Sequence, residues 1–70
     1  MERFELSTDI QLDAILWSHY VSFRKASSTT TRSILSSKFN GAFDVYCYVT
    51  KIHPNEVMDA LYAQYQRNPN

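Results

Sequence analysis

Residues that could catalyse a reaction or bind a metal are few and scattered in this 70-residue sequence. Its two histidines, His19 and His53, lie far apart, and no Cys-x-x-Cys or His-x-x-x-His spacing offers converging metal ligands. The lone Cys47 could pair with His53 as thiolate and base. On the strand that we expect there, however, the two side chains would be about 20 Å apart. We therefore expect Cys47 to be a core residue and His19 to lie on the apolar face of a helix.

The motifs that hold phosphates or activate a serine are also missing. Gly41 is the only glycine, so no glycine-rich phosphate loop exists, and no serine lies in a Gly-x-Ser-x-Gly turn. A chain of this length has little volume for a deep substrate cleft. The sequence therefore predicts a protein that is not an enzyme, with no catalytic or metal-binding residues, no cofactor and no small-molecule substrate.

A basic, hydroxyl-rich segment over residues 24–38 favours contact with nucleic acid. This segment is rich in serine and threonine and contains four cations and no acid. The cations are Arg24, Lys25, Arg32 and Lys38. Phosphate contacts use cations, short hydroxyl donors and the free backbone N–H groups of a helix start. Tyr46 and Tyr48 could stack on bases if they lie on the outer face of a strand. A formal net charge of zero gives this hypothesis no general electrostatic support.

Large apolar side chains favour a second hypothesis, binding to another protein or to a second copy of this chain. The helix expected over residues 9–25 carries two adjoining apolar stripes, which is more than one packing contact requires. Trp and Tyr dominate the energetics of protein interfaces. We expect the interface to draw on Trp17, Val21, Tyr62 and Tyr65. We favour this function, a small regulator, inhibitor or accessory subunit that binds its partner stoichiometrically, over nucleic-acid binding.

The elements that would position these residues follow from the apolar periodicity. Residues 2–7 alternate like a short strand, and Ser7 or Thr8 is expected to cap the helix that runs to about Lys25. One of the threonines at 29–31 should cap a shorter second helix that ends at Phe39. The Asn40-Gly41 pair that follows tolerates the left-handed conformation of a helix end.

Residues 42–52 fit either a strand or a helix. Their β-branched and aromatic side chains favour a strand. On a helix, an equally regular apolar stripe would form from Ala42, Val45, Val49 and Ile52. Pro54 suits the first turn of a last helix that runs to about Arg67, and residues 68–70 should fray.

We therefore expect an α+β fold in one domain over residues 1–70, with the element order β-α-α-β-α. The alternative is an all-α fold of four short helices with a helix-turn-helix-like centre. Because two strands make a marginal sheet with unpaired edges, dimerisation is expected to extend that sheet.

Composition and the number of cysteines limit the class of protein and the cellular compartment that we expect. Apolar residues make up 44% of the chain and aromatic residues 14%, which argues against intrinsic disorder. A single cysteine cannot form the disulfide framework of a small secreted domain. No signal peptide is visible, and the longest apolar run, 14–17, is far shorter than the roughly 20 residues that span a bilayer. The sequence predicts a cytoplasmic protein without a membrane partner.

Overall fold

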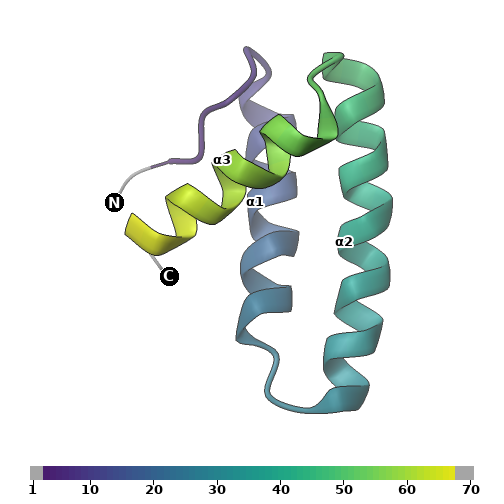
Figure 1. Ribbon diagram of the computed structural model, residues 1–70. Helices are drawn as coiled ribbons and strands as arrows, with labels where there is room; N and C mark the ends of the chain where they lie inside the picture. Colours follow the sequence, from purple (N-terminus) through teal and green to yellow (C-terminus); the bar gives the residue numbers. More distant parts are fainter. Residues whose placement is uncertain (1–2, 68–70) are drawn as a thin grey trace.

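The computed structural model describes residues 3–67, and this part of the chain forms three helices joined by short connections (Figure 1). α1 spans Ile10–Lys25, α2 spans Thr29–Thr50 and α3 spans Pro54–Arg67. α1 and α2 form an antiparallel hairpin, and α3 crosses one side of α1 obliquely. The described residues contain no strand, so the predicted α+β fold is wrong. The all-α alternative fits, with three helices in place of four. Its helix-turn-helix-like centre is wrong, because α2 continues through Asn40 and Gly41.

The main error concerns residues 40–50, which continue α2 instead of ending it and forming a strand. Gly41 does not adopt a positive φ, and the left-handed residue that ends the helix is Lys51, with φ of 63°. On a continuous helix, Phe39 and Tyr46 lie on one face and are both buried. This tertiary burial outweighs the strand propensity of the β-branched and aromatic residues. The helix interpretation of residues 42–52 is therefore confirmed over their first nine residues.

The N-terminal segment is not a strand within the described residues, which begin at Arg3. It runs extended beside the helices and buries Phe4, whose ring stacks on Trp17 with the centroids 5.5 Å apart. Without a sheet, the expected reason for dimerisation, completion of that sheet, also falls away. The predicted fraying of residues 68–70 lies outside the described residues.

The predicted extents of the first and last helices are confirmed. The residues that cap α1 and α2, however, are not the ones expected from the sequence. The α1 cap is Asp9, whose carboxylate accepts a hydrogen bond from Leu12 N at 3.1 Å. Ser28 caps α2 and accepts from Thr31 N at 3.1 Å. In both cases the side chain satisfies a backbone donor that the first helical turn leaves free.

One core joins all these elements. Within residues 3–67, each helix and the N-terminal segment contribute buried apolar side chains, which are Phe4, Leu16, Tyr20, Phe39, Tyr46, Val57 and Leu61. Aromatic rings supply much of the packing, and Tyr20 contacts the Phe39 ring at 5.5 Å between centroids. The α3 side of the hairpin is therefore covered by the chain itself.

Candidate binding surfaces

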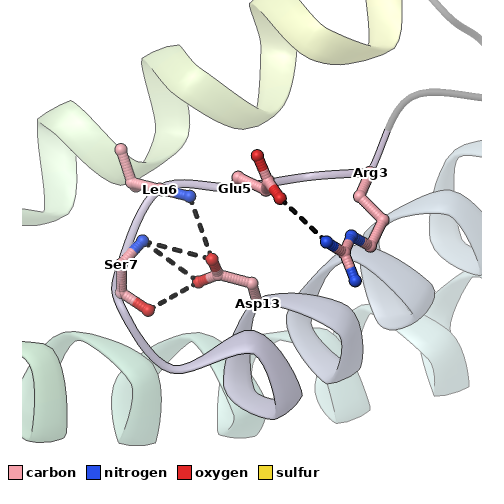
Figure 2. A network of polar contacts seen from close by, with 5 residues as sticks. All are labelled: Arg3, Glu5, Leu6, Ser7 and Asp13. Carbon is pink, nitrogen blue, oxygen red and sulfur yellow. Dashed lines mark hydrogen bonds and ion pairs between the residues drawn. The ribbon is translucent and has the colours of Figure 1, made fainter.

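The most highly connected polar group is Asp13, a carboxylate that is only 1% exposed. One oxygen, Oδ2, accepts hydrogen bonds from Leu6 N at 3.0 Å and Ser7 N at 3.2 Å. The other, Oδ1, accepts from Ser7 Oγ at 2.7 Å and Tyr46 Oη at 2.6 Å. Figure 2 shows the N-terminal segment turning over this carboxylate. These donors offset the cost of burying a charge, so Asp13 fastens the N-terminal segment to α1 and α2.

This network does not supply a reactive group. Burial, reinforced by the hydrogen bond to Asp13, raises the pKa of Tyr46 to about 12, which keeps its phenol protonated. Burial also raises the pKa of the Cys47 thiol, and the Asp44 charge adds to the effect. A thiol with a raised pKa is a poor nucleophile. The expected structural role of Cys47 is therefore supported, although it packs from a helix and not from a strand.

The histidines do not form a metal site either. His19 is half-buried on α1, and exposed His53 precedes α3, where its Nδ1 accepts a hydrogen bond from Asn55 N at 3.1 Å. Over residues 3–67, no group of three or more His, Cys, Asp or Glu side chains is placed to hold a metal ion. None of the three helices in this range is long and apolar enough to cross a membrane.

The four residues predicted to bind a partner lie on one side of the molecule, together with an arginine. We call this the aromatic–arginine surface: Trp17, Val21, Arg24, Tyr62 and Tyr65. The first three follow one another at helical spacing along α1, and the two tyrosines lie at i and i+3 on α3. The Trp17 and Tyr65 rings join the two helices, with their centroids 6.3 Å apart.

Arg24 lies across the tyrosines of this surface. Its guanidinium carbon is 4.7 Å from the Tyr65 ring centroid and 5.9 Å from that of Tyr62. Nη1 also donates a hydrogen bond to Tyr20 Oη at 3.0 Å. Tyr62 is still 54% exposed, whereas Trp17 and Tyr65 are half-buried. Cation–π contacts therefore link Arg24 to a partly exposed group of rings.

The residues proposed for nucleic-acid binding do not gather in the same way. Tyr46 is buried, so the expectation that it lies on an outer strand face is wrong. Arg32 lies over the Phe23 ring at 5.5 Å, and Arg24 is held among the tyrosines. Lys25 and Lys38 remain exposed. Tyr48 is 75% exposed near the other end of α2, where Lys51 Nζ lies 4.5 Å from its ring centroid.

A groove that the sequence did not predict lies on the side of the hairpin away from α3. This α1–α2 groove has a volume of about 430 Å³ and is lined by Leu12, Ile15, Leu16, His19, Lys38, Gly41, Ala42, Val45 and Tyr46. Leu12 also lines a second hollow of about 480 Å³, together with residues 6–9, Val49, Thr50 and Ile52. The sequence feature that could have predicted this groove is the apolar stripe that residues 42–52 form when they are helical.

Apolar side chains remain exposed along this groove. Ile15 is 52% exposed and Val45 is 54% exposed, and Val49, in the second hollow, is 53% exposed.

Comparison of the chain with protein-family models, with curated proteins and with solved structures finds no match. The functional inference therefore rests on the two surfaces themselves.

Proposed function

We propose that this chain is a non-catalytic binding protein that docks on another protein through the aromatic–arginine surface. It would act stoichiometrically, as a regulator, an inhibitor or an accessory subunit. The observation that supports this proposal best is the placement of Arg24 across Tyr62 and Tyr65 while Tyr62 stays 54% exposed. Trp, Tyr and Arg are the residue types enriched in binding hot spots.

The fixed arrangement of these side chains favours tight binding. A free arginine loses rotamer entropy when a partner immobilises it, which lowers the affinity. Here Arg24 is already held by the Tyr20 hydroxyl and by two further rings, so much of that entropy is lost on folding. A protein partner with an apolar pocket and an acidic rim would complement this surface. We place this interaction in the cytoplasm, because a lone cysteine fits a reducing compartment.

A photo-crosslinking amino acid at Tyr62 tests the proposal directly. Tyr48 provides the matched control, since it is also an exposed tyrosine but lies on α2, outside the aromatic–arginine surface. In nuclease-treated lysate of the source cells, we expect a discrete protein adduct from position 62 and none of the same mass from position 48. The same adduct from both positions, or an adduct that nuclease removes, would contradict docking through this surface.

The proposal also predicts how substitutions change affinity once that partner is purified. Tyr62→Ala and Arg24→Ala should each weaken binding by roughly tenfold or more, as expected for hot-spot residues. Tyr48→Ala should leave the dissociation constant unchanged. Circular dichroism of each variant checks that the helices remain folded, so that a loss of affinity can be assigned to the surface.

A further inference from the structure

We infer that the α1–α2 groove is an interface between two copies of this chain, which pack antiparallel about a twofold axis. This interface is independent of the proposed function because it uses the other side of α1. Helical spacing places Leu12, Ile15 and His19 opposite Trp17 and Val21. One copy could therefore bind a second copy and a different protein at the same time.

The groove is an apolar surface that the described chain leaves uncovered. Its rim carries Ile15 and Val45, each more than half exposed, and its floor includes Leu16 and Tyr46, each 1% exposed. No residue of α3 lines it among those described. Contiguous exposed apolar patches, when they are large, mark interaction sites.

Gly41 gives an independent reason to place another helix here. It is the only glycine in the sequence, and it lies exposed in the middle of α2. A Cβ added at this position would meet no atom within 4 Å, so packing within the chain does not require a glycine. Glycine destabilises a helix interior relative to alanine. Its absence of a side chain is useful if the backbone of a second helix crosses α2 closely at this point.

The charge distribution makes the surface self-complementary in the antiparallel orientation. No acid occurs in the sequence between Asp13 and Asp44, so the α1–α2 turn carries only cations, and two of them, Lys25 and Arg32, lie outside the aromatic–arginine surface. Asp9 and Glu56 lie at the other end of the molecule, where α1 and α3 begin, and they outnumber Lys51, which caps the end of α2 there (Figure 1). Antiparallel packing brings each cationic turn towards the acidic end of the other copy, whereas parallel packing would superimpose like charges.

The length of the hairpin is compatible with the interface of a stable dimer. A standard protein interface buries about 800 Å² on each partner, which is roughly one sixth of the 4709 Å² accessible surface of this chain. The hairpin is long enough to supply it, because a helix the length of α2 extends about 33 Å. A twofold-symmetric pair is also the commonest oligomer of soluble proteins.

Sedimentation equilibrium with Val45→Glu and Ile10→Glu tests this interface. Ile10 is the matched control because it is 56% exposed, close to the value for Val45, and lines neither hollow. Between about 1 μM and about 1 mM, we expect wild-type chain and Ile10→Glu to dimerise with similar dissociation constants. Val45→Glu should weaken the dimer by roughly 30-fold or more. A wild-type monomer throughout, or equal weakening by both substitutions, would overturn the inference.

Gly41→Ala separates loss of the interface from loss of the fold. Alanine should preserve or increase the helical circular dichroism signal and the thermal midpoint of the monomer, yet weaken the dimer by roughly tenfold, because the added methyl groups keep the two α2 helices apart. An unchanged dimer dissociation constant would overturn the close crossing at Gly41.

The dependence of the dimer on salt tests the antiparallel orientation. Raising the salt concentration from about 0.05 M to about 0.5 M should weaken an antiparallel dimer, because salt screens the attraction between opposite charges. A dimer that becomes stronger with salt would overturn that orientation.

Discussion

The two sides of α1 are covered to very different degrees. Trp17 faces the side where the N-terminal segment and α3 lie, and its ring contacts Phe4 and Tyr65. Ile15, two residues earlier, faces the α1–α2 groove and stays 52% exposed. The first side has aromatic stacking and a held arginine, whereas the second has aliphatic side chains around a glycine. One side is therefore packed by this chain, and the other is left uncovered by the described residues.

Within the described residues, this difference reflects the short span of α3. A domain of this size buries a small share of its surface, and α3 extends only about 21 Å. That helix covers one side of the α1–α2 hairpin, and no described segment remains to cover the other. A fourth helix would be needed to close the groove, and a second copy can supply it.

The largest expected change in the free energy of unfolding comes from Asp13, which joins the N-terminal segment to α1 and α2. Asp13→Ala removes the acceptor for Leu6 N, Ser7 and Tyr46 Oη and leaves those donors without a partner. We predict a loss of about 3 kcal/mol in the free energy of unfolding. Urea denaturation at low micromolar concentration measures it. A loss below about 1 kcal/mol would mean that the N-terminal segment is not held through this carboxylate.

A pair of substitutions compares the two sides of α1 directly. Trp17→Ala should lower the free energy of unfolding of the monomer by about 2–3 kcal/mol, because it removes ring contacts to Phe4 and Tyr65. Ile15→Ala should cost less than about 1 kcal/mol, since that side chain is half exposed. Equal costs, measured by the same denaturation, would erase the contrast between the packed side and the groove.

The buried phenol gives the packed side a distinct dependence on pH. The pKa of Tyr46 is raised to about 12, and that of an unfolded tyrosine is about 10. The neutral phenol is therefore favoured by folding, and its contribution is complete below pH 10 and is lost as the pH rises towards 12. Tyr46→Phe should remove this decline in stability, and Tyr48→Phe should retain it. The free energy of unfolding, followed against pH for both variants, makes the comparison.

Arg24 tests the rigidity of the aromatic–arginine surface. Arg24→Ala removes its contacts with Tyr62 and Tyr65 and should lower the free energy of unfolding by about 1 kcal/mol. Lys25→Ala, at the exposed neighbouring position, should change it by less than about 0.5 kcal/mol. If Arg24→Ala were as neutral as Lys25→Ala, the guanidinium would not be held in solution.

The smallest expected effect is a gain in stability. Gly41→Ala should raise the free energy of unfolding of the monomer by about 0.5–1 kcal/mol, because alanine is the better helix former and meets no neighbour there. Ala14→Gly, at an exposed position of α1, should produce a loss of similar size. Destabilisation by Gly41→Ala at low concentration would show that the glycine is required within a single chain.

The sequence predicts the first and last helices well but not the second. α1 and α3 have apolar residues at helical spacing, polar or proline starts and no internal helix breaker, and these local signals are sufficient. The second half of α2 is rich in strand-favouring residues, and Asn40-Gly41 has the composition of a helix end. Only the burial of Phe39 and Tyr46 against the rest of the fold decides for a helix.

The same limit applies to the surfaces. Trp17, Tyr62 and Tyr65 could be proposed from residue type alone, because Trp and Tyr are frequent in interfaces. The groove could not be predicted without knowing that residues 42–50 are helical. The hydrogen-bond network of Asp13 includes Tyr46, which lies 33 positions away in the sequence. No local sequence pattern predicts a hydrogen bond over that separation.

Methyl NMR spectra recorded over a dilution series test the central claim most directly, namely that the α1–α2 side is completed by a second copy. We predict that the Ile15 and Val45 methyl resonances shift with concentration while the Ile10 methyl resonances do not. The two isoleucines are similarly exposed, at 52% and 56%, so exposure alone would not separate them. Invariant spectra, or shifts at Ile10 in place of Ile15 and Val45, would contradict the account.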